Sequence, residues 1–217
     1  MPLYLKVGSF ITRHWHYKQL VREILEGRRS HEERVMALFD WTVRNIQPQP
    51  SGLPVVDDHV WHIIVRGYGT GDQVNDVLST LATYAGFNST WFYLQDPARK
   101  GKLYLTAINV DGRWHLFDPY YRNAFRHPEG RLASWEEIAA DPTIAALAPN
   151  QPEIKGLPYR RYFVGLVGLR PDVGWSRGPI QQPWPRLKYE VRRWLGLLPP
   201  RKSGAVVLNP QAFSKAQ

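Results

Sequence analysis

The sequence has no cysteine among its 217 residues. This absence excludes disulfide bonds, a cysteine nucleophile, thiolate zinc sites and cysteine-ligated iron–sulfur clusters. Hydrophobic residues make up 43% of the chain and charged residues 22%, a balance that is typical of globular proteins and too apolar for general disorder. The length predicts one domain, or one domain with an extension.

Long hydrophobic runs are also missing. No stretch approaches the roughly 18 consecutive apolar residues of a transmembrane helix. The N-terminus, MPLYLKVGSFITRHW, lacks the basic start and apolar core of a secretory signal. The sequence therefore predicts a cytoplasmic protein, with a peripheral position on a membrane as the alternative.

Acidic residues are scarce in the last third of the chain. Residues 1–154 carry 16 Lys and Arg against 17 Asp and Glu, whereas residues 155–217 carry 12 against 2. We interpret this shift as a division into a domain (1–154) and a basic extension (155–217) that is rich in proline and glycine. Such charge indicates an acidic partner, a membrane surface or nucleic acid.

Within the extension, residues 186–198 have the pattern of an amphipathic helix with apolar residues on one face. Four cations lie on its other faces and form a predicted basic surface: Arg186, Lys188, Arg192 and Arg193. An anionic membrane, a protein partner and packing on the chain's own body all fit this pattern. Nucleic acid is not favoured, because no nucleic-acid-reading motif accompanies the charge.

Periodicity, caps and turn signals predict the remaining elements. Capping boxes at Ser30–Glu33 and Ser134–Glu137 mark two helix starts, and Asp111-Gly112 predicts a tight hairpin. The expected order is a helix at 17–26, a helix at 30–46, a long loop at 47–70, a helix at 72–85, strands at 89–95, 103–110 and 113–118, a short helix after 134, and a strand at 162–169.

A glycine-rich approach to a helix (Gly-Tyr-Gly-Thr-Gly71-Asp72-Gln73), a strand, and then Asp111-Gly-Arg-Trp114 and Asp118-Pro119 occur in this order. The order resembles the transglutaminase-like superfamily over roughly residues 30–125. The resemblance implies an α+β, papain-like fold, with N-terminal helices plus a central helix packed on an antiparallel sheet. It also implies a catalytic cysteine at the helix N-terminus, a histidine on a strand and an aspartate on the next strand.

This chain departs from that catalytic set at two of three positions. The cysteine position falls on Gly71 and the histidine position on Leu103 or Tyr104, whereas the aspartate is retained as Asp118. The resemblance therefore implies a degenerate, non-catalytic member, which we expect to act as a binding or scaffold component. By family position, several residues would line the former cleft and hold an unidentified protein, a peptide or a glycan: Trp61, Tyr68, Asp72, Gln73, Tyr104 and Tyr120.

Other chemistry stays open from the sequence. A hydroxyl nucleophile would have to come from Thr70, which is better placed as a helix cap, or from Ser79 in the middle of a helix. Asp72 and Asp118 would form a carboxylate pair for a rebuilt hydrolase or transferase. His115 is the nearest replacement base, but strand alternation predicts that it faces away from Asp118.

His59 and His62 follow Asp57 and Asp58 at a spacing that one helical turn would bring together. No matched further ligand accompanies them, so the stretch is better explained as a structural or solvated loop. We therefore expect neither a metal site nor a cofactor.

Overall fold

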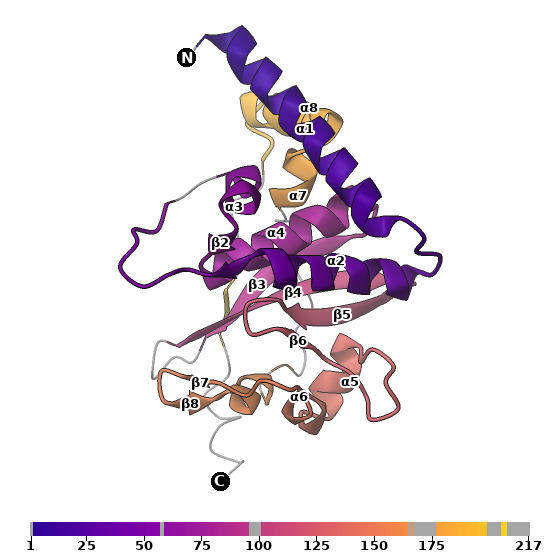
Figure 1. Ribbon diagram of the computed structural model, residues 1–217. Helices are drawn as coiled ribbons and strands as arrows, with labels where there is room; N and C mark the ends of the chain where they lie inside the picture. Colours follow the sequence, from indigo (N-terminus) through magenta and orange to yellow (C-terminus); the bar gives the residue numbers. More distant parts are fainter. Residues whose placement is uncertain are drawn as a thin grey trace.

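The computed structural model describes residues 2–56, 59–95, 101–164, 166, 177–198 and 205–207. Its centre is helix α4 (Gly71–Tyr84), which packs on a five-stranded sheet (Figure 1). The strands lie in the order β6-β5-β4-β3-β9. Their bounds are β3 Ser89–Gln95, β4 Lys102–Val110, β5 Arg113–Asp118, β6 Asn123–Ala124 and β9 Ala205–Val207. All pairings are antiparallel except that of β3 with β9. The predicted α+β arrangement of N-terminal helices and a central helix on an antiparallel sheet is confirmed.

The central hairpin forms because its turn residues adopt the backbone that such a turn needs. Asp111 has a φ of 51° and Gly112 a φ of 86°, so both lie in the left-handed region. The register then pairs Val110 with Arg113 and Thr106 with Phe117. The strands predicted at 89–95, 103–110 and 113–118 are thus confirmed, and they follow α4 in the order that the transglutaminase-like resemblance implies.

Two helices precede the sheet. Helix α2 (His31–Asn45) begins at the predicted capping box, where Ser30 Oγ accepts from the Glu33 N–H. Helix α1 (Leu3–Leu25) begins far earlier than the predicted residue 17. Its N-cap is Pro2, which makes no side-chain cap hydrogen bond, so the start carried no sequence signal.

The predicted loop at 47–70 contains more regular structure than expected. Helix α3 (Val60–Arg66) lies within it and buries Val60 and Ile63. On either side of this helix, the short strands β1 (Gln47–Pro48) and β2 (Tyr68–Gly69) pair in parallel. The loop prediction is therefore wrong for these residues, because seven residues of helix and two of strand are too short for a periodicity argument.

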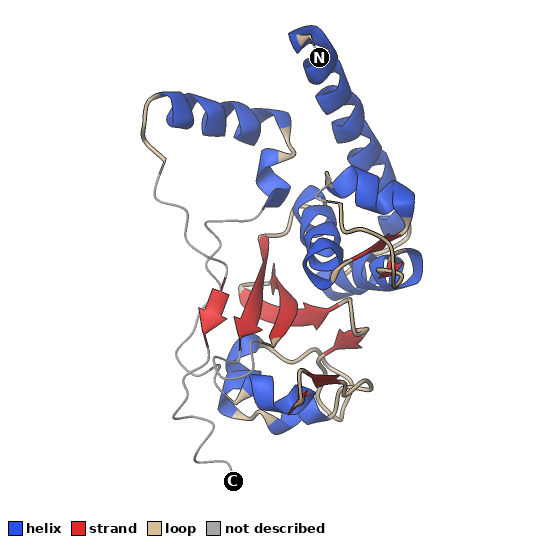
Figure 2. Ribbon diagram, turned by 90° about the vertical axis from the view of Figure 1, so that its left-hand side faces the viewer, coloured by secondary structure: helices blue, strands red, loops and turns tan. Residues whose placement is uncertain are grey.

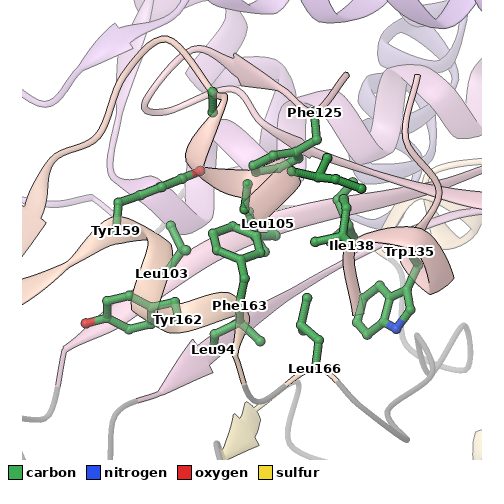
Figure 3. Packing of buried hydrophobic residues seen from close by; sticks show 14 of the residues in the cluster. Leu94, Leu103, Leu105, Phe125, Trp135, Ile138, Tyr159, Tyr162, Phe163 and Leu166 are labelled. Carbon is green, nitrogen blue, oxygen red and sulfur yellow. The ribbon is translucent and has the colours of Figure 1, made fainter. Parts of the chain in front are cut away.

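Two apolar clusters occupy the two faces of the sheet. On the α4 face, Val77, Leu78 and Phe117 pack with α1 and α2. On the other face, Leu103 and Leu105 pack with aromatic residues from the later chain (Figure 3). The segment Tyr159–Phe163 contributes most of these and is a 3₁₀ helix, so the strand predicted at 162–169 is wrong for its described start.

The other small elements of the later chain lie beneath the sheet in Figure 1. Helix α5 begins at the predicted capping box of Ser134 and Glu137. These elements are α5 Trp135–Ala140, α6 Thr143–Ala146, β7 Glu153–Ile154 and β8 Leu157–Pro158. Because Tyr159 and Phe163 are buried in the same cluster as α5, the packed core continues beyond residue 154. The division of the chain at that residue stays a prediction.

The basic extension contributes helices α7 (Arg177–Ile180) and α8 (Pro183–Trp194). The amphipathic helix predicted at 186–198 is therefore present. It begins earlier because prolines are well accommodated in a first helical turn, and it ends earlier, two residues before Gly196, whose φ of 68° is left-handed. Across the described residues, no helix combines the length and the hydropathy that crossing a membrane requires.

Candidate functional site

The N-terminus of α4 is built by its local sequence. Thr70 is the N-cap, and Oε1 of Gln73 accepts from the Thr70 N–H at 3.2 Å. Oγ1 of Thr70 donates to Oδ1 of Asp72 at 2.5 Å. Thr70 therefore occupies the predicted N-cap position. Such an end, with unpaired backbone N–H groups and the positive end of the dipole, is where a thiol would be acidified.

The ring of Tyr104 stands at the position where that thiol would lie. A Cβ placed on Gly71 would lie 2.9 Å from Cδ2 of Tyr104, closer than real Cβ contacts. The Tyr104 ring also lies 5.6 Å from Tyr93 and 6.2 Å from Trp91, centroid to centroid. Burial, and then the charge of Asp72, raise the pKa of Tyr104. Tyr104 is thus a neutral, packed aromatic side chain.

The two candidates for the histidine position lie on opposite faces of the sheet. Tyr104 pairs with Tyr93 and packs against α4 at Gly71. Leu103 is fully buried in the cluster on the other face. Only Tyr104 therefore faces the start of α4.

Asp118 lies on the opposite face of the sheet from Gly71 and Tyr104. It is fully buried, accepts from the Tyr121 N–H at 3.0 Å and from the Tyr159 hydroxyl at 2.8 Å, and so points to the face occupied by Tyr159. Its neighbour Phe117 packs on the α4 face, as alternation requires. Burial raises the pKa of Asp118 to about 7 in spite of these hydrogen bonds. Asp118 is therefore part of the packed core beneath the sheet.

The predicted cleft residues are spread over several places. Trp61 stacks on His16 at 4.9 Å, between α1 and α3. The Arg66 guanidinium lies 5.0 Å from the Tyr68 ring. Gln73 is nearly buried and donates to the Val56 carbonyl at 2.7 Å. Tyr120 packs edge-on against Tyr121 at 5.0 Å.

Of the predicted binding residues, Asp72, Gln73 and Tyr104 lie at the start of α4, and of these three Asp72 and Tyr104 are partly exposed. These contacts do not place all six predicted residues around a single cleft.

The alternative nucleophiles and bases are held in structural roles. Ser79 is fully buried, and its carbonyl accepts from the Ser89 hydroxyl at 2.6 Å. Nδ1 of His115 lies 3.0 Å from the Ala133 carbonyl, and burial lowers the pKa of this imidazole. His115 pairs with Ile108 on the α4 face of the sheet, so the prediction that it faces away from Asp118 is confirmed.

The carboxylate pair of a rebuilt site is not assembled either. Asp72 lies in the first turn of α4 on one face of the sheet, whereas Asp118 is buried on the other face. For the metal hypothesis, the rings of His59 and His62 lie 5.8 Å apart. Asp57 and Asp58 lie outside the described residues, and within those residues no three metal-ligating side chains converge.

One buried ionisable residue near the site has no counterpart among the sequence predictions. Asp76, one turn into α4 from Asp72, is 2% exposed, and burial raises its pKa to about 7 although Arg177 lies 3.4 Å away. Arg177 belongs to α7. Directly after this helix, the Gln181 carbonyl accepts a hydrogen bond of 2.8 Å from the Tyr84 hydroxyl of α4. The sequence signal that could have identified Asp76 is a carboxylate among the apolar residues of the predicted helix at 72–85.

No protein-family model matches the chain, and no curated protein matches it in sequence. Solved structures are similar to part of it. A candidate cysteine protease from Cytophaga hutchinsonii is 15% identical over 54% of this chain and 39% of its own, with a TM-score of 0.43. A candidate protease from Parabacteroides distasonis is 16% identical over 48% of this chain and 23% of its own, with a TM-score of 0.40. A structure described as a TGase is 10% identical over 50% of this chain and 32% of its own, also with a TM-score of 0.40. These partial likenesses concern the fold, and this chain spans less than half the length of each of those proteins.

Proposed function

We propose that this chain is a non-catalytic, transglutaminase-like domain that binds a partner. The observation that carries the proposal is the contact of Tyr104 with Gly71, where a Cβ would lie 2.9 Å from the ring. A side chain at position 71 and a catalytic base beside it would need the space that this ring occupies. Acyl transfer needs a nucleophile, a base and an orienting group within hydrogen-bond reach of one another, and Asp118 is turned to the opposite face of the sheet.

The binding surface that we propose lies on the aromatic side chains at this end of the sheet. Trp91, Tyr93 and Tyr104 share one sheet face and are all partly exposed. Lys102 lies 4.7 Å from the Tyr93 ring, and Asp72 stands at the helix start. Flat aromatic faces beside one cation and one anion suit a peptide or a glycan, because ring stacking combines with hydrogen bonds to polar groups.

The proposed absence of catalysis is tested by assaying the purified full chain for amidase, peptidase and amine-transfer activity. We expect no turnover above the uncatalysed rate. Asp72→Asn and Asp118→Asn are compared with Asp111→Asn, an exposed hairpin carboxylate that serves as the matched control. Turnover that is lost in Asp72→Asn or Asp118→Asn but kept in Asp111→Asn would refute the proposal.

The binding part is tested on peptide and glycan arrays with the wild-type chain, Tyr93→Ser and Tyr4→Ser. Tyr4 is 73% exposed on α1 and controls for the loss of any exposed tyrosine. We expect a ligand class whose signal falls about fivefold in Tyr93→Ser, because one stacked ring contributes on the order of 1 kcal/mol. Equal signals from the two variants would place the binding surface elsewhere.

A further inference from the structure

Helix α8 leaves its apolar face uncovered. Trp184, Leu187, Val191 and Trp194 follow one another at helical spacing and are 64%, 52%, 47% and 85% exposed. The helix buries none of its residues. In Figure 2 it lies apart from the helices that cover the sheet and connects to the body through α7. An amphipathic helix in a monomeric domain ordinarily buries such a face, so this one requires an occupant.

Helix α1 leaves a second apolar face uncovered. Its later part packs on the core through Tyr17 and Val21, whereas Tyr4, Val7 and Ile11 are exposed. With Trp15, which is 63% exposed, these three residues form a stripe at a spacing of three to four residues. These residues are exposed because the N-terminal half of α1 extends beyond the sheet and the helices that cover it (Figure 1).

The two uncovered faces belong to the same end of the molecule. Figures 1 and 2 differ by a turn about the vertical axis, and in both the N-terminal half of α1 and the whole of α8 lie at the top, away from the sheet. They are separate helices in Figure 2, so neither covers the other. We refer to the two exposed stripes as the two-helix surface, defined by Tyr4, Val7, Ile11 and Trp15 of α1 and Trp184, Leu187, Val191 and Trp194 of α8.

Positive charge surrounds both stripes. Residues 3–22 of α1 contain Lys6, Arg13, Lys18 and Arg22 and no acidic residue. Helix α8 contains four cations, which are Arg186, Lys188, Arg192 and Arg193, against Glu190 alone. A second copy of the chain would bring like charges together at this surface, whereas an anionic occupant would be attracted.

We infer that the two-helix surface docks on an anionic lipid bilayer. A bilayer offers both an apolar layer for the stripes and a negative surface for the flanking cations. Tryptophan and tyrosine favour the boundary between headgroups and acyl chains, and they occur in both stripes as Tyr4, Trp15, Trp184 and Trp194. The inference is independent of the proposed binding surface at Tyr93 and Tyr104.

The experiment is co-sedimentation of the full chain with vesicles of phosphatidylcholine alone and of phosphatidylcholine mixed with phosphatidylserine. We expect binding to the anionic vesicles that weakens as salt is raised, because screening shortens the reach of the cations. Arg192→Gln with Arg193→Gln should reduce partitioning about 25-fold, since each cation near an anionic surface contributes about a fivefold effect. Leu187→Gln with Val191→Gln, and Val7→Gln with Ile11→Gln, should each reduce it about tenfold or more.

Leu147→Gln is the matched control, because Leu147 is 57% exposed beside α6 at the opposite end of the molecule. It should bind vesicles as the wild type does. Three results would overturn the inference: no binding to anionic vesicles, an equal loss in Leu147→Gln, or retained binding when either stripe carries glutamines. Sedimentation equilibrium without lipid provides the remaining discrimination, since a dimer abolished by these glutamine pairs would assign the surface to a second copy instead.

Discussion

The start of α4 and the tip formed by α1 and α8 use their aromatic and apolar side chains in opposite ways. At the start of α4, Tyr104 fills the space beside Gly71, and Asp118 is sealed into the core beneath the sheet. At the tip, Trp15 and Trp194 are 63% and 85% exposed, and no other part of the described chain buries them. The difference shows that a neighbouring side chain fills the position of the missing thiol, whereas the apolar faces at the tip are exposed.

The burial of Asp118 should have the largest measurable effect, because it makes the free energy of unfolding depend on pH. Asp118 has an ordinary carboxyl pKa of 3.8 when unfolded and a pKa of about 7 when folded, so the folded chain holds a proton that the unfolded chain releases. The contribution of Asp118 to stability should therefore be greatest below about pH 4 and be lost as pH rises to about 7, with little change above. Between pH 5 and pH 8, Asp118→Asn should remove a stability difference on the order of 3 kcal/mol.

Urea unfolding at pH 5 and pH 8 measures this difference for the wild type and for Asp118→Asn. Asp76, whose pKa burial also raises to about 7, keeps part of the dependence in the variant. Asp111→Asn is the control, because that carboxylate is exposed on the hairpin. Identical pH dependence in the wild type and Asp118→Asn would contradict the burial of a protonated Asp118.

Restoring the missing thiol should disturb the same region. In Gly71→Cys the new Cβ meets the Tyr104 ring at 2.9 Å, and we expect a loss of about 1.5 kcal/mol in the free energy of unfolding. Tyr104→Ala added to Gly71→Cys should recover part of this loss, because the ring is then absent. Chemical denaturation of the two single variants and the double variant measures the coupling. Additive losses would show that the ring does not fill this space.

The pair of Arg177 and Asp76 connects the two regions, because it holds α7, and with it α8, against α4. Arg177→Gln should cost about 1 kcal/mol of stability, since it weakens a partly exposed contact to a buried carboxylate. Hydrogen exchange should then be faster at α7 and at the C-terminal half of α4, while the hairpin is unaffected. Arg193→Gln is the control, because the Arg193 side chain is 67% exposed. Unchanged exchange at α7 would mean that the pair does not hold it.

The open region should tolerate substitution with the smallest effect of all. Val7→Gln and Val191→Gln remove apolar side chains that are 53% and 47% exposed, so we expect changes within about 0.5 kcal/mol. Val77→Gln, at a fully buried position of α4, provides the contrast and should destabilise strongly. Thermal melts of the three variants would measure this, and a large loss in Val7→Gln or Val191→Gln would mean that these faces are covered in the folded chain.

Much of the fold was predictable because its signals are local. The capping boxes at Ser30 and Ser134 and the Asp111-Gly112 turn each act within four residues, and each predicted element formed. Short or weakly marked elements were missed for the same reason. Helix α3 spans seven residues, and the start of α1 has no side-chain cap.

The candidate site was predictable by position but not by contact. The motif order indicated Gly71 and Tyr104, and the structure brings these two together. It also indicated Trp61, Gln73 and Tyr120, which lie in separate contacts. Spacing along a chain does not specify which residues from different elements meet, because the packing of the helices on the sheet determines that.

The sequence by itself determined the loss of thiol chemistry, the elements around the central hairpin and the positive charge of residues 155–217, because composition and local pattern suffice for each. Only the tertiary structure decided that Tyr104 fills the space beside Gly71 and that Asp118 faces away from it. It also decided that α1, a basic helix within an otherwise neutral body, projects at the same end as α8. Burial and adjacency arise from long-range packing, and no local pattern contains them.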